Sequence, residues 1–313
     1  MERDTIVDRF LAQGEANGAV PALWYRLGNT WKHYTWAQYI AEARAFAGAL
    51  LALGFEPGDG VAIMSNNNPQ WVIADVGTML ARGVPAGIYQ TSTDEQALYI
   101  ANHCEARVVV LEDFAIWEAL GGALWASKLE HTERIVMIRD AEKTDLEMVV
   151  SFEDFVATGD DLQGAVDERI AAIQDEDLAT LIYTSGTTGP PKGVMLSHHN
   201  LAWTTKQSLE LVGGTEPDDS IVSYLPLSHI AEQQFSILLP ITAGVCVWFC
   251  DDLKKVKDVM IVARPTLFLA VPRVWEKFRN ALETRLEGST GAKKRVVDFS
   301  RETLLKAGYV ILA

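Results

Sequence analysis

A run of hydroxyl and glycine residues, followed by one lysine, supplies the groups that a polyphosphate site needs. Residues 184–189 read Thr-Ser-Gly-Thr-Thr-Gly, and Lys192 lies three positions beyond them. Gly186 and Gly189 let a backbone approach an anion closely and adopt positive φ, and successive N–H groups in such a loop can form a nest for phosphate oxygens. Lys192 adds a full positive charge. Four hydroxyl groups can donate hydrogen bonds to phosphate, those of Thr184, Ser185, Thr187 and Thr188.

The spacing of this run differs from that of the Walker A loop. A Walker A loop has Gly, four residues and then Gly-Lys-Ser/Thr, whereas here Pro191 stands where the second Gly would be and Gly193 follows Lys192. The spacing therefore argues against a phosphoryl-transferring P-loop ATPase. A flexible polar linker is the simpler alternative. Because residues 178–183 form an apolar run long enough for a buried strand, the sequence favours a strand that opens into a phosphate loop.

Composition narrows the functional classes. The 313 residues are 49% hydrophobic and 22% charged, which is ordinary for a globular protein. The net charge of −15 is unsuited to sequence-independent DNA binding and to an anionic membrane surface. An anionic ligand needs a local positive site in so acidic a chain, and Lys192 would contribute to one.

The cysteines and the hydropathy of the chain predict its cellular compartment. The cysteines, Cys104, Cys246 and Cys250, provide no disulfide framework and indicate a reducing compartment, so we expect a cytoplasmic protein. No His lies near Cys246 and Cys250 in the sequence, and we expect core thiols there rather than a zinc site. The amino terminus lacks the apolar core of a signal peptide. Residues 235–249, the longest apolar-rich stretch, fall short of the roughly 20 residues of a membrane span, and we expect core helix and strand there.

Apolar periodicity predicts strands that alternate with helices. The expected elements begin with a hairpin over residues 22–34 and a helix over residues 36–53 that Thr35 caps. Further strands are expected at residues 61–65, 84–89, 107–111, 135–138, 178–183, 194–196, 220–224, 245–249 and 267–270, and further helices at residues 69–81, 94–103 and 197–209. The alternation indicates βαβ units and a mainly parallel sheet. Acidic residues 160–177 mark an expected boundary between a first α/β subregion, 1–170, and a second, 171–313, that carries the phosphate loop.

Residues 183–193 fill every position of a known signature loop, roughly Tyr-Thr/Ser-Ser-Gly-Thr/Ser-Thr-Gly-x-Pro-Lys-Gly. The chain thus resembles the adenylate-forming superfamily of acyl-CoA synthetases, luciferases and peptide-synthetase adenylation domains. The resemblance implies the α/β fold of their amino-terminal domain, with stacked, mainly parallel sheets and helices between and around them. It implies ATP as a substrate, a catalytic role for Lys192 and Mg²⁺ bound at Thr184. The residues implied around the nucleotide phosphates are Thr184, Ser185, Gly186, Thr187, Thr188, Gly189 and Lys192.

Two further segments resemble the long-chain fatty acyl-CoA synthetase branch of this superfamily. Residues 223–229, Ser-Tyr-Leu-Pro-Leu-Ser-His, resemble the segment near the acyl and adenylate sites, which implies a catalytic role for His229. Residues 271–276, Val-Pro-Arg-Val-Trp-Glu, resemble a stretch typical of the long-chain enzymes. The resemblance runs from about residue 35 to the end and implies activation of a long-chain fatty acid with ATP to acyl-AMP, followed by transfer to CoA.

Later motifs of the superfamily find no match here. They are a Tyr-Gly-x-Thr-Glu segment, a ribose-binding Asp and a lysine of the carboxy-terminal domain, so we expect a truncated first domain, without the carboxy-terminal domain and incomplete for turnover. A fatty acyl-AMP ligase that feeds a carrier protein and a non-catalytic nucleotide-binding fragment stay open as alternatives. Long-chain fatty acid, ATP and CoA are the expected partners, without nucleic acid or a transmembrane segment. Peripheral membrane contact and a homodimer are left open.

Overall fold

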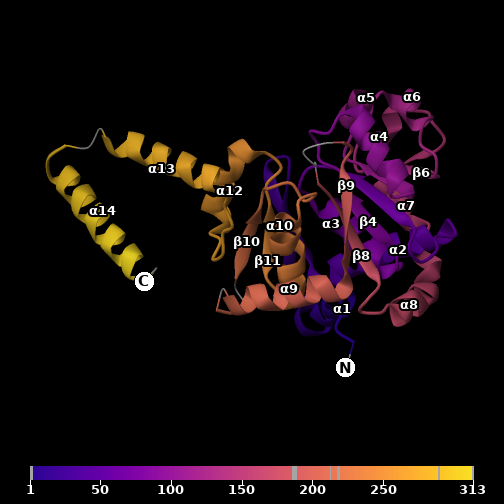
Figure 1. Cartoon of the computed structure of the whole chain (residues 1–313), viewed down its shortest axis with the longest axis horizontal. Helices are drawn as coiled ribbons and strands as arrows, with labels where there is room; N and C mark the ends of the chain where they lie inside the picture. The colour runs from indigo at the N-terminus through magenta and orange to yellow at the C-terminus, as the bar shows by residue number, and fades with distance from the viewer. Residues whose placement is uncertain (1–2, 185–188, 212, 217–218, 288–289, 312–313) are drawn as a thin grey trace. The chain divides into compact units, whose positions relative to one another are not determined.

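The computed structural model describes residues 3–184, 189–211, 213–216, 219–287 and 290–311. The chain divides into two compact units, residues 1–267 and residues 268–313. Both sheets and the helices from α1 to α12 belong to the first unit (Figure 1). The second unit contains α13 (Pro272–Glu287) and α14 (Gly291–Ile311), drawn in gold and yellow.

A seven-stranded sheet is the frame of the first unit. Its strand order is β7-β6-β5-β3-β4-β8-β9, and all neighbours are parallel except β8 and β9, which are antiparallel. The predicted mainly parallel sheet is therefore confirmed. The strands are β3 (Gly60–Met64), β4 (Val84–Gly87), β5 (Ala106–Leu111), β6 (Arg134–Met137), β7 (Val149–Ser151), β8 (Leu178–Thr184) and β9 (Lys192–Ser197).

A four-stranded sheet accompanies it, in the order β10-β11-β1-β2. The antiparallel hairpin of β1 and β2 confirms the expectation for residues 22–34, and β11 pairs in parallel with both β1 and β10. Segments far apart in sequence thus share one sheet. The strands are β1 (Pro21–Leu27), β2 (Thr30–Thr35), β10 (Ser220–Ser223) and β11 (Cys246–Phe249).

The apolar core lies on both faces of the seven-stranded sheet, because side chains alternate along each strand. On β3, Val61 and Ile63 join a buried cluster with α2, α3 and strands β1 and β11 of the other sheet. Ala62 and Met64 point the other way and join a second cluster with α4, α5 and α6, which lie together in Figure 1. Helices α2 and α3 therefore pack between the two sheets. All of α3 except Gln70 is buried, which is typical of a helix enclosed on every side.

The helices of the first unit begin at recognisable caps. Thr5, Thr35 and Thr93 each form a capping box with the residue three positions on, and Asn68 caps α3, whose first residue is Pro69. The α-helices are α1 (Ile6–Asn17), α2 (Trp36–Ala52), α3 (Pro69–Leu80), α4 (Asp94–His103), α5 (Phe114–Leu120), α6 (Gly122–Ala126), α7 (Phe152–Ala157), α8 (Gln163–Ala172), α9 (His198–Leu211), α10 (Ile230–Gln233), α11 (Leu239–Ala243) and α12 (Val256–Ala263). A π-helical turn, Gln234–Leu238, joins α10 to α11.

One expected strand is wrong. Residues 267–270 have no strand conformation, because the N–H groups of Thr266 and Leu267 both donate to the single carbonyl of Ser220 instead of to successive carbonyls of β10. Helices α1 and α8 occupy segments where none was expected. The subregion boundary near residue 170 stays a prediction, although residues on both sides of it contribute strands to both sheets. Among the described residues, no helix is long and apolar enough to span a membrane.

Candidate active site

The predicted phosphate loop connects β8 to β9. β8 ends at Thr184, β9 begins at Lys192, and these two residues are partners across the antiparallel ladder. The pair closes the base of the loop and places the lysine beside the loop's first hydroxyl-bearing residue. Four of the predicted site residues lie outside the described residues, namely Ser185, Gly186, Thr187 and Thr188.

The described end of the loop has the features expected of an anion site. Gly189 has a φ of +92°, a conformation that favours glycine, and an added Cβ would meet no atom of the described residues within 4 Å. Lys192 is exposed and forms no ion pair with any residue that the structure describes. Its charge is therefore available to a bound anion.

Tyr183, the residue before Thr184, holds the β8–β9 hairpin in place. Its ring is buried and lies over the backbone of Gly193, where an added Cβ would come within 3.3 Å of the ring. Its hydroxyl is 2.7 Å from Nδ1 of His103 at the end of α4, and burial raises the pKa of the tyrosine. The glycine after Lys192 therefore makes room for Tyr183, which fixes β9 and its lysine against the sheet.

The loop opens at the carboxyl edge of the parallel strands. β8 runs parallel to β4, and β4 runs parallel to β3. The segments after β3, β4 and β8 therefore emerge at one edge of the sheet. Open α/β sheets bind their ligands at this edge.

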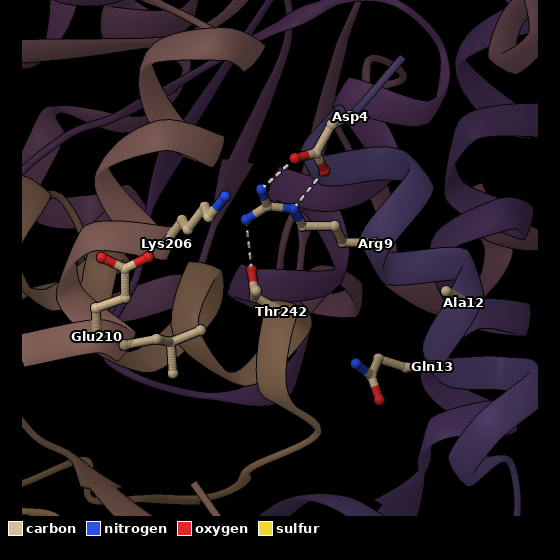
Figure 2. Close-up of a pocket in the computed structure, with 8 residues that line it drawn as sticks. Asp4, Arg9, Ala12, Gln13, Lys206, Glu210 and Thr242 are labelled. Atoms are coloured by element: carbon tan, nitrogen blue, oxygen red, sulfur yellow. Dashed lines mark hydrogen bonds and ion pairs between the residues drawn. The ribbon is translucent and has the colours of Figure 1, made fainter. Parts of the chain in front are cut away.

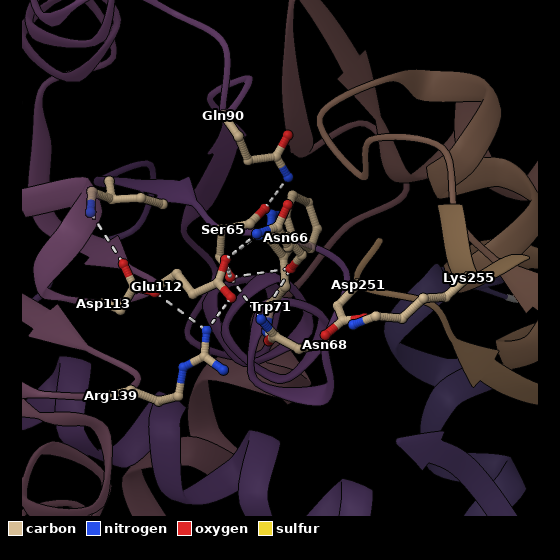
Figure 3. Close-up of polar contacts among 11 residues, drawn as sticks. Ser65, Asn66, Asn68, Trp71, Gln90, Glu112, Asp113, Arg139, Asp251 and Lys255 are labelled. Carbon is tan, nitrogen blue, oxygen red and sulfur yellow. Dashed lines mark hydrogen bonds and ion pairs between the residues drawn. The ribbon is translucent and has the colours of Figure 1, made fainter. Parts of the chain in front are cut away.

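A polar cluster holds the segment that follows β3 (Figure 3). Glu112, only 5% exposed after β5, accepts hydrogen bonds from the backbone and side-chain amides of Asn66, each at 2.7 Å. Arg139 forms an ion pair with the same carboxylate, and Gln90 donates to the carbonyl of Ser65. Because Glu112 is paired on several sides, the cluster stabilises the loop rather than presenting an empty site.

Asn67 joins the edges of the two sheets. Its side-chain amide donates to the hydroxyl of Ser223 at 2.9 Å and to the carbonyl of Leu225 at 2.8 Å. Nearby, an added Cβ on Gly87 at the end of β4 would lie 2.7 Å from Cα of Ser228. The segment after β10 therefore packs on the carboxyl edge that also carries the phosphate loop.

A buried carboxylate shapes this segment. Glu232 is 1% exposed and accepts from the N–H of Tyr224 at 3.1 Å and from the hydroxyl of Ser236 at 2.7 Å. Burial raises the pKa of Glu232 to about 7, while hydrogen bonds from Ser236 and Ser223 oppose the rise. Glu232 thus ties the chain just before His229 to the helix just after it.

His229 stands at the start of that helix. It is exposed, and its Nδ1 accepts a hydrogen bond from the N–H of Ala231 at 3.1 Å, which caps α10. An accepting Nδ1 carries no proton, so the protonated Nε2 is the ring nitrogen that can donate to a substrate. The buried hydroxyl of Ser228 and side-chain amide of Gln233 lack hydrogen-bond partners among the described residues, and both flank the histidine in sequence. Polar atoms of a ligand would satisfy such groups.

A cavity lies away from these residues. It has a volume of about 460 Å³ and lies between α1, α9 and α11 (Figure 2). Arg9 crosses it and is already bound to Asp4 at 2.6 Å and to Thr242 at 3.2 Å. None of the predicted site residues lines it, so this cavity is not the candidate active site.

The described residues contain no group of three or more His, Cys, Asp or Glu side chains that could hold a metal. Cys250 is buried and Cys246 half-buried, and burial raises the pKa of Cys246 to about 12 and that of Cys250 to about 11. Both thiols therefore behave as packing groups at neutral pH.

A model of the AMP-binding enzyme family matches residues 10–305. The chain belongs to this family. It is 37% identical over 288 residues to the long-chain-fatty-acid–CoA ligase ACSBG2 of Gallus gallus, covering 90% of this chain and 38% of that protein. It is 35% identical over 310 residues to the ligase of the same name from Rattus norvegicus, covering 96% of this chain and 46% of that protein. The chain thus spans less than half the length of these relatives.

Solved structures share the fold. A long-chain-fatty-acid–CoA ligase from Archaeoglobus fulgidus superposes with a TM-score of 0.74 at 21% identity, over 92% of this chain and 54% of that one. The anthranilate CoA ligase AuaEII, solved with anthranoyl-AMP, gives 0.73 at 22% identity, over 85% and 49%. The fold predicted from the signature loop, that of an adenylate-forming amino-terminal domain, is confirmed.

The sequence points to the loop and to His229 as site residues, which stay predictions, but not to the residues that hold them in place. Glu112, Asn67 and Glu232 were not singled out. A signal existed for Glu112, a carboxylate directly after an apolar strand. Glu232 lies among the polar residues Gln233, Gln234 and Ser236 and gave no such signal. Asn67 gave no such signal, because its partners lie in a distant segment of the chain.

Proposed function

We propose that this chain serves the ATP-dependent activation of a long-chain fatty acid to acyl-AMP and then to acyl-CoA. The observation that carries the proposal is the position of Lys192 beside Thr184, at the base of a glycine loop on the carboxyl edge of the sheet. Lys192 is exposed and has no ion-pair partner among the described residues. Membership of the AMP-binding family supports adenylation as the chemistry. The names of the relatives support a long-chain acid as the substrate.

The chemistry follows from charge placement. A carboxylate oxygen of the acid attacks the α-phosphorus of ATP, and the bond to the β-phosphate breaks with its electron pair leaving on pyrophosphate. In the proposal Lys192 binds the departing phosphates and offsets the charge that develops there. The thiolate of CoA then attacks the acyl carbonyl and AMP leaves. His229 presents Nε2 toward the substrates while Nδ1 holds its helix.

Mg²⁺ fits the described part of this loop. It prefers oxygen ligands and keeps several waters while binding substrate phosphates, so it needs few protein ligands. The exposed hydroxyl of Thr184 at the end of β8 is such an oxygen. Bound there with ATP, the ion would neutralise phosphate charge. Peripheral membrane contact and a homodimer stay open predictions beside this proposal.

The test is acid-dependent ATP–pyrophosphate exchange, followed by acyl-CoA formation, with the natural protein that carries this sequence. A tunnel that buries methylenes gains about 0.8 kcal/mol for each, so kcat/KM should rise about fourfold per methylene from short to long acids until the tunnel is filled. Preference for acetate or an aromatic acid would contradict the long-chain assignment. Exchange without acyl-CoA formation would favour an acyl-AMP ligase, and ATP binding without exchange a non-catalytic domain.

A further inference from the structure

His103, the last residue of α4, is the hydrogen-bond partner of the Tyr183 hydroxyl. Its Nδ1 lies 2.7 Å from the hydroxyl oxygen, a hydrogen-bonding distance whichever of the two atoms donates. The ring centroid of His103 lies 5.2 Å from that of Tyr99, one turn earlier on α4, and 5.7 Å from that of Tyr183. His103 is therefore held between a tyrosine of its own helix and a tyrosine of β8.

Tyr183 carries this contact across to the strand that begins with Lys192. Tyr183 and Gly193 are partners across the β8–β9 ladder. The position that a Cβ of Gly193 would take lies 3.3 Å from Cζ of the tyrosine and 3.5 Å from both Cε1 and the hydroxyl oxygen. The oxygen that bonds to His103 is thus part of the surface on which the backbone next to Lys192 rests.

The position of β9 depends on this surface. β9 is the edge strand of the seven-stranded sheet, and among the described residues β8 is its one strand neighbour. Cross-strand side-chain pairs stabilise neighbouring strands against each other, but Gly193 has no side chain to pack. The ring of Tyr183 therefore supplies the packing at this pair, directly beside Lys192.

We propose that His103 is a positioning residue for Lys192. By holding the ring of Tyr183 on Gly193, it places the lysine for the phosphates of a bound nucleotide. The Tyr183 side chain is 2% exposed, and a hydroxyl that loses its partner in such surroundings is drawn toward water. The ring would then turn and β9 would move with it, and a misplacement of about 1 Å can cost on the order of a hundredfold in rate. The inference rests on the proposed function, which assigns Lys192 to phosphate binding.

A purely structural role for His103 is the alternative. It is the basic residue in the last turn of α4, and a histidine cation there stabilises a helix whose carboxyl end carries partial negative charge. Removing such a contribution would lower the melting temperature, and its effect on phosphate binding would add to that of Lys192→Ala. Positioning predicts instead that His103 matters for phosphate binding only while Lys192 is present.

The experiment is a double-mutant cycle on the natural protein that carries this sequence, read by calorimetric binding of inorganic tripolyphosphate. His103→Leu removes the hydrogen-bonding nitrogen, and Tyr183→Phe removes the hydroxyl but keeps the ring. Each should weaken binding about two- to tenfold, the net contribution of one hydrogen bond, and the pair together no more than the worse single change. In the Lys192→Ala background His103→Leu should cause no further loss. His103→Asn, whose amide can reach the place of Nδ1, should bind nearly as well as the natural protein.

Matched controls remove similar groups nearby. His131→Leu replaces an exposed histidine, and Tyr99→Phe removes a hydroxyl from the ring on the other side of His103; both should leave binding unchanged. Equal losses from His103→Leu with and without Lys192 would overturn the proposal, as would tripolyphosphate binding that does not depend on Lys192. If His103→Leu does not fold, Tyr183→Phe in both backgrounds carries the same test.

Acid-dependent ATP–pyrophosphate exchange, measured on the same variants, separates this inference from the proposed function. Coupled tripolyphosphate binding without any exchange would contradict adenylation alone, because the binding measurement contains no ATP, acid or CoA. Exchange that depends on Lys192 but is lowered by His103→Leu to the same extent in both backgrounds would contradict the positioning role alone.

Discussion

The position of Lys192 on its strand decides what this lysine can do. As the partner of Thr184 it is held at the loop's base, and the packing of Tyr183 on Gly193 prevents the strand from sliding. A lysine in a free loop would have to be ordered each time an anion bound, at the cost of side-chain entropy. Here the ladder has fixed the backbone beforehand, and only the side chain remains to be ordered.

We expect Lys192→Ala to lower the rate of acid-dependent ATP–pyrophosphate exchange about ten- to hundredfold. The lost interaction is a charged hydrogen bond, worth about 1.5–3 kcal/mol. Since Lys192 is exposed and unpaired among the described residues, the melting temperature should not change. Lys128→Ala removes an exposed lysine of the same unit and is the control. Full exchange activity in Lys192→Ala would remove this residue from the site.

Helices and strands were predicted correctly where the residues that indicate them lie within a few positions of one another. The hairpin of β1 and β2, the Thr35 cap and the strand before the phosphate loop follow from turn residues, capping boxes and apolar runs within a few positions. Helix α1 has the same kind of signal, a capping box of Thr5 and Asp8 beside the apolar residues Ile6, Val7 and Phe10, although it is not among the predicted helices. Helix α8 lies in a segment where acidic residues obscure the four-residue spacing of buried Val166 and Ile170.

The strand order and the ties between the sheets could not be predicted. They depend on pairings between residues that lie far apart in sequence, and no single segment carries that information. The strand expected at residues 267–270 failed for the same reason, since an apolar run becomes a strand only when a neighbouring edge offers successive carbonyls. Glu232 owes its importance to the same kind of distant packing.

We expect Glu232→Gln to impair use of the acid more than use of ATP. The N–H of Tyr224 and the hydroxyl of Ser236 both donate to Oε1 of Glu232, and its carboxylate also accepts from Ser223 and from the backbone of Leu225. The amide has one accepting oxygen where the carboxylate has two, so at least one of these donors loses its partner at a cost of about 1–3 kcal/mol. The segment before His229 should shift, while the phosphate loop on β8 and β9 stays in place. In the exchange assay kcat/KM for the acid should fall tenfold or more, with a smaller change in KM for ATP.

Glu118→Gln, on an exposed position of α5, is the matched control and should leave both parameters unchanged. Equal losses for ATP and acid in Glu232→Gln would show a general loss of folded protein rather than displacement of the His229 segment. Measuring the folded fraction by circular dichroism at the assay temperature separates the two.

At the scale of the whole first unit, stability should depend on groups buried between the sheets. Asp75 on α3 is 1% exposed, and its Oδ1 has no hydrogen-bond partner among the described residues. Burial raises the pKa of Asp75 to about 8. His198, 2% exposed, shifts the other way, because burial lowers the pKa of its imidazole to about 4.

The signs of these shifts predict the pH dependence of unfolding. An acid with a raised native pKa stabilises the fold fully below its unfolded pKa, and that stability is lost as pH rises through the native pKa. For Asp75 the window runs from 3.8 to about 8, and for Glu232 from 4.5 to about 7. The loss is at most about 1.4 kcal/mol per pH unit for each group. His198 contributes stability that is lost as pH falls from 6.5 to about 4. Over that range this contribution grows with rising pH and so opposes the decline. The decline should therefore be steepest near neutral pH, where Asp75 and Glu232 both contribute and His198 no longer opposes them.

The isosteric change Asp75→Asn isolates one of these contributions. An amide of the same shape has no charge to bury. The free energy of unfolding of the variant should therefore rise steadily, relative to that of the natural chain, from pH 4 to pH 8. Urea unfolding at half-unit pH intervals, followed by far-ultraviolet circular dichroism, gives the two stability curves. Asp145→Asn, at an exposed position, is the control, and its stability curve should run parallel to that of the natural chain at every pH. If Asp75→Asn also runs parallel, Asp75 is already ionised in the folded protein, and the enclosure of α3 between the two sheets admits water or a counter-charge that the described packing lacks.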